Sequence, residues 1–407
     1  MIFRLTMKKI FFNFLLILVV LPVFSQTPIA VPQSTKDTFE KDIITLDSLI
    51  LNSKLNDSVS NYYKFVYKAE NEYIKQNYKK ASEYYEKAFG YLKYPFMRDL
   101  SRAIYCEKES RKNIDNLKKY LELYLSKTKK KESTYDYSRN LPLQDSIEIV
   151  KLIETIKPVV DSSLVNYLNE LFRIDQDVRK GLSWPLSEEE GMLLHITDST
   201  NYSKLLEIVD KYPNLSEEIY GTAWSAFSII LNHCRVIPDV RIYIKLHSMV
   251  MNGQIDARNY VNSLEISLFS KKQSFGGAHY GYEYVNWDTN NWDTNTRDKF
   301  YIYLKQTSKD EKMINKYRNK LYLEDMKSYH KKRIWAMRTD ADKKGQIIYY
   351  FTELYGSNEG SYKILSKKTY NDKKVKIYYK NKEDKKRIKK AMKEYNKNRN
   401  NNDTDTE

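Results

Sequence analysis

The chain has 407 residues, 41% of them hydrophobic, which is enough for two or three domains with real cores. Only 11 Gly and 9 Pro are present, which favours long helices and argues against a β-sandwich or β-barrel. The formal net charge of +16 gathers near the C-terminus, where residues 361–400 hold sixteen Lys or Arg against four Asp or Glu, so the nearly neutral body gives no sign of a nucleic-acid-binding domain.

Residues 1–25 have the layout of a secretory signal peptide. The segment starts with the basic residues Arg4, Lys8 and Lys9. A nearly unbroken apolar run follows at 10–24, and the small residues Val23 and Ser25 precede a cleavage site before Gln26. The run is short for a membrane span, which needs about 20 apolar residues, although a retained signal anchor is the alternative. No Cys follows the cut, which argues against a lipoprotein anchor. We therefore expect a periplasmic or extracellular protein.

Residues 26–56 form a Pro/Thr/Gln-containing leader, and a helical pattern begins at Asp57. Two apolar faces with three- and four-residue spacing follow: Tyr62, Phe65, Val66, Ala69 and Tyr73, then Tyr78, Ala81, Tyr85, Ala88 and Leu92. A weaker second hairpin covers 96–110 and 113–125. The pattern predicts helical hairpins over 57–125.

The segments 69–73 and 77–88 resemble a tetratricopeptide repeat, with Gln76 at the turn position where Gly is usual. Small Ala81 and Ala88 let two helices approach closely. The resemblance implies stacked helical hairpins that bind a protein or peptide partner. Because such a stack normally needs at least three repeats and about two are visible, we expect this unit to lean on its neighbour or on a partner.

The rest of the chain divides by composition. Residues 126–146 are Lys-rich and polar, which is typical of a linker, and 147–296 read as a helical domain of unknown function. Its helices are expected at 162–180, 202–212, 223–235, 238–253 and 256–268. Residues 297–338 read as helical, and the alternating runs 347–351 and 375–379 predict strands, so 297–382 reads as a helix plus a small β hairpin. Residues 383–407 form a basic tail that we expect to be disordered and able to make weak contact with an anionic surface. The predicted fold class is mainly α.

One polar pair interrupts an otherwise apolar helix face. Asp175 and Arg179 continue the stripe of Leu164, Leu168 and Leu171 at four-residue spacing. Charges in such a place are costly unless they are paired. Two interpretations stay open: a buried ion pair that fixes the helix register, and a ligand-binding or catalytic cluster.

Further polar residues extend this candidate cluster. They are Gln176, His233, and the pair His279–Tyr280 displayed between glycines. The motifs Asp175-Gln176-x-x-Arg179, Asn232-His233 and Gly276–Gly281 resemble those of an uncharacterised helical family of bacterial proteins over about 162–285. That family carries a late Gly-x-Gln-x-Tyr-Gly-Thr motif, where this chain has His279 and Tyr282. The resemblance attaches no activity.

Other chemistry has little support. No CxxC, HExxH, P-loop or GxGxxG motif occurs, so we expect no metal site and no cofactor. Cys106 and Cys234 lie on apolar helix faces and read as buried free thiols. Trp287 and Trp292 occur in a repeated Asn-Trp-Asp-Thr, which fits either a polar loop anchored by two rings or a glycan contact.

Three functions follow from these residues. The first is a non-enzymatic interaction protein of the cell envelope that binds a protein or peptide through its helical repeats. The second is an envelope hydrolase built on Asp175, Arg179, His233 and His279, for which no nucleophile with its base can be named. The third is a glycan-binding surface protein that uses the loop of Trp287 and Trp292. We favour the first, with no sequence-specific nucleic-acid partner.

Overall fold

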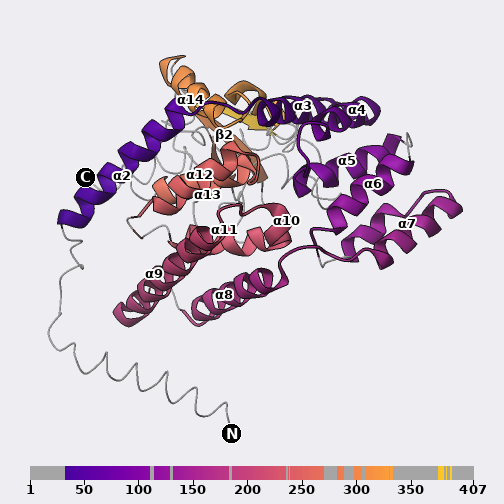
Figure 1. The fold of residues 1–407 in the computed structure, drawn as a ribbon. Helices are drawn as coiled ribbons and strands as arrows, with labels where there is room; N and C mark the ends of the chain where they lie inside the picture. Colours follow the sequence, from indigo (N-terminus) through magenta and orange to yellow (C-terminus); the bar gives the residue numbers. More distant parts are fainter. Residues whose placement is uncertain are drawn as a thin grey trace, which may run out of the picture.

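The computed structural model describes residues 33–110, 114–128, 132–182, 186–234, 237, 239–269, 282–287, 298–304, 308–329, 331–332, 375–379, 382 and 386. These residues are mainly helical, as the scarcity of Gly and Pro predicts (Figure 1). The predicted fold class is confirmed, because helical hairpins are followed by further helices and a small β element lies toward the C-terminus.

The chain order of the helices is α2 (Gln33–Asn52), α3 (Asp57–Tyr73), α4 (Tyr78–Phe89), α5 (Met97–Ser110), α6 (Ile114–Leu125), the 3-10 helix η1 (Glu132–Tyr137), α7 (Leu143–Thr155), α8 (Ser162–Lys180), α9 (Glu188–Lys211), α10 (Glu217–Tyr220), the 3-10 helix η2 (Gly221–Ala223), α11 (Trp224–His233), α12 (Arg241–Met251), α13 (Ala257–Phe269) and α14 (Ser308–Lys320). The helices expected at 57–125 and at 162–180 are present.

Helices α3 to α6 form two consecutive hairpins. Ala81 and Ala88 of α4 are fully buried, so their small side chains allow α3 and α4 to pack closely. In the turn between these helices Gln76 adopts φ +62°, the left-handed region that Gly takes without steric cost. The usual Gly of such a turn is therefore replaced by a residue that accepts the same strained backbone.

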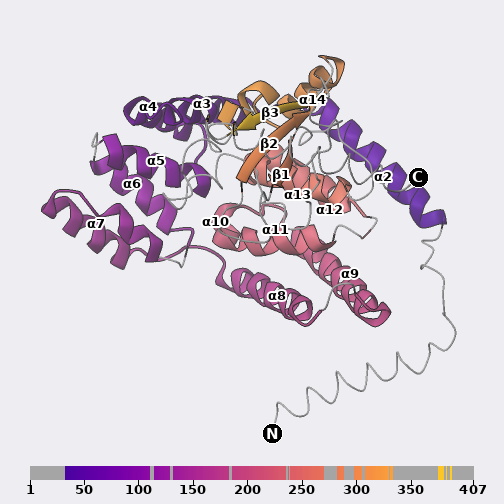
Figure 2. The same ribbon diagram turned by 180° about the vertical axis from the view of Figure 1, so that it is seen from behind.

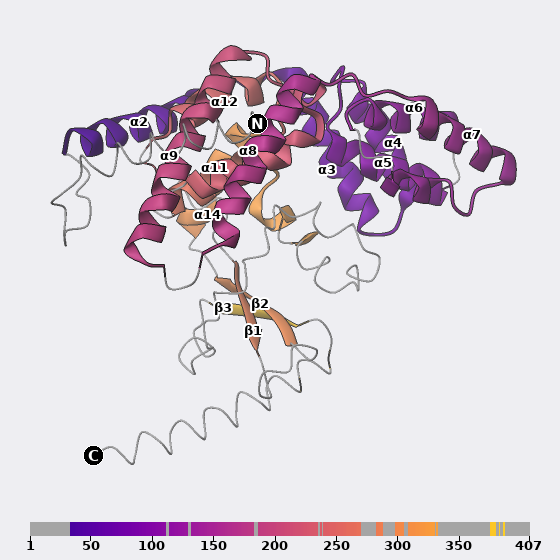
Figure 3. The same cartoon turned by 90° about the horizontal axis from the view of Figure 1, so that it is seen from below.

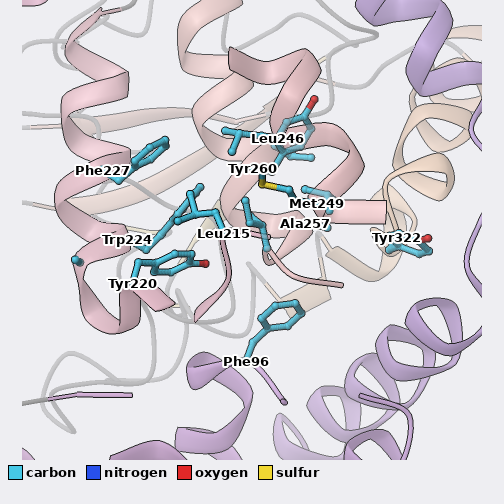
Figure 4. Close-up of a cluster of buried hydrophobic side chains, with 14 of the residues drawn as sticks. Phe96, Leu215, Tyr220, Trp224, Phe227, Leu246, Met249, Ala257, Tyr260 and Tyr322 are labelled. Atoms are coloured by element: carbon cyan, nitrogen blue, oxygen red, sulfur yellow. The ribbon is translucent and has the colours of Figure 1, made fainter. Parts of the chain in front are cut away.

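The hairpins and the later helices share one hydrophobic core. Buried side chains from Phe39 to Leu323 form a single contiguous cluster. Figure 4 shows part of it, where Phe96 lies below Tyr220 and Trp224. Burial of each large apolar side chain stabilises the fold by about 1.5–3 kcal/mol. The hairpin unit does lean on its neighbour, as the shortage of repeats predicts.

The predicted leader is partly helical. Residues 33–52 form α2, which packs on α12 and α14 (Figure 1). Phe39, Leu46 and Ile50 are buried, and their seven- and four-residue spacing places them on one helical face. The prediction that residues 26–56 form a leader is wrong for 33–52. Many polar residues separate the buried apolar positions there, so the helical spacing is weak in the sequence.

The stretch read as a linker is also structured. Residues 132–137 form η1, and Lys127, Thr128 and Thr134 are buried. The Lys127 ammonium donates to the carbonyl oxygen of Pro95 at 2.7 Å and lies 3.0 Å from a carboxylate oxygen of Glu218. The polar composition of residues 126–146 therefore reflects polar contacts inside the protein and does not mark a solvated linker.

Three strands form an antiparallel sheet in the order β1-β2-β3 (Figure 2). They are β1 (Tyr282–Trp287), β2 (Asp298–Leu304) and β3 (Val375–Tyr379). The strand expected at 375–379 is present, and the one expected at 347–351 lies outside the described residues. Residues 298–304, which we expected to be helical, form β2 because aromatic and β-branched residues dominate them.

The predicted signal peptide and, apart from Lys386, the predicted basic tail lie outside the described residues. None of the helices in the described part of the chain has both the length and the hydropathy that crossing a bilayer requires.

Candidate functional site

Helix α8 presents the candidate polar pair from its buried face. Asp161 caps the helix, because its carboxylate accepts hydrogen bonds from the backbone N–H groups of Ser163 (2.9 Å) and Leu164 (3.0 Å). Leu168, Leu171 and Asp175 then lie on the face that packs into the protein. The sequence thus places a carboxylate in the core, where it must find donors.

Asp175 is fully buried and accepts four side-chain hydrogen bonds. One oxygen, Oδ1, accepts from Arg179 Nη1 (2.8 Å) and Asn201 Nδ2 (3.2 Å). The other, Oδ2, accepts from Gln176 Nε2 (2.9 Å) and His233 Nδ1 (2.7 Å). These four donors meet the full accepting capacity of a carboxylate, which offsets the cost of its burial.

Helices α8, α9 and α11 supply this cluster and lie side by side in Figure 3. Arg179 connects α8 to α9, since its second nitrogen donates to the carboxylate of Asp198. Burial raises the pKa of Asp198, and the bond from Arg179 opposes that rise. One guanidinium therefore serves two carboxylates.

His233 is oriented by the buried carboxylate. A carboxylate can only accept, so Nδ1 of His233 carries a proton and donates it to Asp175 Oδ2, and this bond fixes the orientation of the ring. The side chain is 30% exposed, and that of Arg179 is 21% exposed, so the cluster reaches the surface at one edge. An imidazole held in this way can act as a general base.

A nucleophile for such a base is missing from the described residues, where no Ser, Thr or Cys side chain hydrogen-bonds His233. Cys234 is next in sequence, but its thiol donates to the backbone carbonyl of Asp198 at 3.2 Å. Burial raises the pKa of Cys234, which keeps the thiol protonated and unreactive. Within the described part of the chain, no group of three or more His, Cys, Asp or Glu residues is arranged to hold a metal ion.

The structure brings Asp175, Gln176, Arg179 and His233 together, as the sequence suggested. His279, Tyr280 and Trp292 lie outside the described residues. Trp287 is the last residue of β1, so the described half of the tryptophan pair ends a strand instead of standing in a loop.

Sequence reasoning missed Asp198 and Asn201, which complete the cluster from α9. Their three-residue spacing on the face that continues with Tyr202 and Leu205 was the available signal. The sequence predicts a helix only from Tyr202, whereas α9 begins at Glu188, so Asp198 and Asn201 fall outside the predicted helix. Asn232, part of the expected motif, has its Oδ1 buried without a hydrogen-bond partner among the described residues.

A second feature is a hollow of about 340 Å³ beside α3 and α4, lined by Lys68, Asn71, Glu72, Lys75, Tyr84, Ser328 and Lys331. Lys75 Nζ lies 2.6 Å from a carboxylate oxygen of Glu72, and Asn77 donates to the other oxygen at 3.1 Å. Lys68 and Lys331 are exposed at the hollow and outweigh the single carboxylate.

Comparison of the chain with protein-family models, with curated proteins and with solved structures found no match.

Proposed function

We propose that the protein is a non-enzymatic interaction protein of the bacterial cell envelope, which binds a protein or peptide partner through its tetratricopeptide-like hairpins. The signal-peptide layout of residues 1–25 supports a place outside the cytoplasm. The observation that carries the proposal is the lysine-lined hollow on the first hairpin.

The chemistry of the hollow favours an acidic segment of the partner. Lys68 Nζ lies 5.2 Å from the ring centre of Phe65 and 5.9 Å from that of Tyr84, so the ammonium is held over aromatic faces at the rim. Glu72 is already paired with Lys75. A carboxylate that enters the hollow therefore meets net positive charge and an aromatic wall.

Capture of envelope proteins by the immobilised mature chain tests this proposal. Charge reversal in the double variant Lys68→Glu/Lys331→Glu should abolish capture of the partner. The matched control is Lys64→Glu, which reverses another exposed lysine of α3 that does not line the hollow. Equal capture by all three proteins, or none by the unaltered chain, would refute the proposal.

A second candidate is an envelope hydrolase centred on His233. Its support is the partly exposed imidazole that the buried Asp175 orients. If this function is correct, the mature chain releases soluble fragments from an envelope polymer fraction, and His233→Asn loses that activity while its melting temperature is kept. An unaltered polymer would exclude this candidate for the substrates tried.

A further inference from the structure

A segment after α14 contacts Tyr67 and Glu70 of α3. This strap, defined as residues 324–329 with 331–332, ends on a fully buried lysine, Lys332. The Lys332 ammonium lies 2.5 Å from Glu70 Oε2 and 2.8 Å from Glu324 Oε2. It also lies 4.7 Å from the ring centre of Tyr67. The carboxylate of Glu70 and the ring of Tyr67 thus form a binding site for an ammonium group, and Lys332 of the same chain occupies it.

This place is built to hold a cation even apart from the strap. Glu70 is buried, and the surrounding cations Lys332, Arg102 and Arg258 hold its pKa below the usual range despite burial. Arg258 pairs in turn with Asp99 (2.7 Å) and Asp256 (2.8 Å), so the floor of the site stays ordered by its own ion pairs. A buried, ionised carboxylate beneath a tyrosine face is a recognition surface for an ammonium group.

The strap is joined to α14 by a strained residue. Tyr322 adopts φ +57° at the end of α14, where the backbone N–H of Leu323 bonds the carbonyl of Arg318 at 2.8 Å. Gly is usual in that position, and a bulky residue there stores strain. Tyr322 itself is anchored, since its hydroxyl accepts from Asn56 N at 2.8 Å and donates to Met251 O at 3.2 Å. Tyr322 therefore has the position of a hinge, with its ring anchored on one side and the strap on the other.

The strap is held mainly by polar contacts. Its two buried apolar side chains, Met326 and Tyr329, form a small cluster apart from the main core. Burial raises the pKa of Glu324 to about 7, although Lys332 opposes the rise, so the strap's own carboxylate is costly to keep ionised. When Lys332 leaves, Arg102 and Arg258 still neutralise Glu70, so opening the strap leaves no unpaired charge on α3. The strap is thus poised to open more easily than the helices beneath it.

We propose that the strap is an intramolecular ligand, hinged at Tyr322, and that a lysine from a basic segment of a partner takes the place of Lys332 on Tyr67 and Glu70 when the strap opens. This goes beyond the proposed binding of an acidic segment in the hollow and uses a different face of α3. The two are linked, because Ser328 and Lys331 of the strap line the hollow. Opening the strap removes two walls of that hollow.

A labelled, amidated peptide with the sequence of residues 324–332 tests the proposal on the mature full-length chain. The variant Lys332→Met empties the ammonium place, while Arg102 and Arg258 continue to neutralise Glu70. We expect this variant to bind the peptide at least tenfold more tightly than the unaltered chain does. A peptide carrying Lys332→Met should not bind. The control chain Lys327→Met, altered at an exposed lysine of the strap that does not line the hollow, should behave as the unaltered chain.

A folded Lys332→Met chain that binds the peptide no better than the unaltered chain overturns the proposal. Hydrogen exchange of the unaltered chain gives a second, independent reading. Amides of the strap such as that of Tyr329 should exchange at least a hundredfold faster than those of Leu100 and Ile104 in α5. Equal protection would make the strap an inseparable part of the fold. Because Lys68→Glu should leave peptide binding unchanged, failure here is distinguishable from failure of the proposed hollow.

Discussion

At the scale of single residues, positive φ angles mark the positions where the backbone constrains the sequence most. Gln76 and Tyr322 adopt left-handed conformations with a side chain present, while Gly221 has φ +53°. An L-residue pays roughly 1–2 kcal/mol for this conformation. The consequences differ, because Gln76 lies on the surface and Gly221 lies against a neighbouring backbone.

Gln76→Gly should stabilise the protein by about 1 kcal/mol or less. The change relieves the left-handed strain, and the greater freedom of Gly in the unfolded chain offsets part of the gain. Urea unfolding of the mature protein measures the difference. Lys119→Gly, at an exposed position inside α6, is the matched control and should cost about 1 kcal/mol. A loss of stability in both variants would show that the turn holds Gln76 without strain.

Gly221→Ala should be among the most damaging single changes. A Cβ atom there would lie 2.2 Å from the carbonyl oxygen of Lys127 and 2.8 Å from Val160 Cγ1, and the positive φ adds strain. We expect a loss of at least about 3 kcal/mol in the free energy of unfolding. Gly191→Ala in α9 is the control, because nothing lies within 4 Å of its added Cβ. That control should be neutral or stabilising by up to about 1 kcal/mol.

At the scale of elements, the buried polar cluster of α8, α9 and α11 allows a quantitative prediction of how substitutions change stability. Asp175→Asn should destabilise the protein by about 3 kcal/mol, because an amide presents a donor to a ring of donors. Arg179→Met should cost a similar amount, because it removes the ion-pair partner of Asp198 and one of the four donors to Asp175. The double variant should recover only part of the loss, since Asp198 stays unpaired. Adding Asp198→Asn should recover more.

Chemical unfolding of these variants, with Arg173→Met as control, provides the measurement. Arg173 forms ion pairs with Glu170 and Asp177 on the same helix, but its side chain is 60% exposed. Its loss should therefore change stability by less than about 1 kcal/mol. Single variants at Asp175 and Arg179 that behave like Arg173→Met would indicate a solvated binding site in place of a structural ion pair.

A histidine joins α12 to the end of α2 and gives the contact a pH dependence. Ser53 Oγ donates to Leu49 O at 2.6 Å, so His247 Nε2 donates to Ser53 Oγ at 2.7 Å. Nδ1 of His247 is buried without a partner in the described part of the chain. Burial lowers the pKa of His247 from 6.5 to about 4, since a second N–H would have no acceptor.

The neutral ring therefore contributes stability that is complete above pH 6.5 and is lost as the pH falls toward 4. The unaltered chain should lose up to about 3 kcal/mol over this interval that His247→Gln does not lose. Unfolding curves at several pH values test the difference. His195→Gln, at an exposed site on α9, should keep the full acid sensitivity. Identical pH profiles for the unaltered chain and His247→Gln would contradict this assignment.

The elements differ in how far their sequence alone could predict them. The helix at 162–180 was predictable because an Asp cap, an apolar stripe and a closing Gly181 all agree locally. The second partner of Arg179 was not, because Asp198 lies on another helix and only tertiary packing brings the two together. The buried lysine Lys127 shows the same limit, since its polar neighbours in sequence favour a linker while its partners lie elsewhere in the chain.

At the scale of the whole molecule, buried charges join the hairpins to the later helices. Glu217 of α10 accepts from the backbone N–H of Met97 at 2.7 Å, which caps the start of α5, and lies 3.5 Å from Lys127 Nζ. Lys127 in turn donates to Pro95 O. One acidic side chain thus fixes the orientation of the second hairpin on the helices that carry the Asp175 cluster.

The last prediction concerns the pH at which the contacts of Glu217 with Met97 and Lys127 stabilise the fold most. Burial raises the pKa of Glu217 to about 7, although Lys127 and the Met97 N–H oppose the rise. Because the folded pKa lies above the unfolded value of 4.5, this group favours folding as the pH falls from 7 to 4.5 and costs up to about 3 kcal/mol when ionised at pH 8. Glu217→Gln keeps an acceptor for Met97, so it should be more stable than the unaltered chain at pH 8 and equal to it at pH 4.5. Glu218→Gln, whose side chain is 24% exposed, should show no such crossover in urea unfolding. If Glu217→Gln is instead less stable than the unaltered chain at pH 8, the prediction is wrong. In that case the attraction between ionised Glu217 and Lys127 outweighs the cost of desolvating the carboxylate.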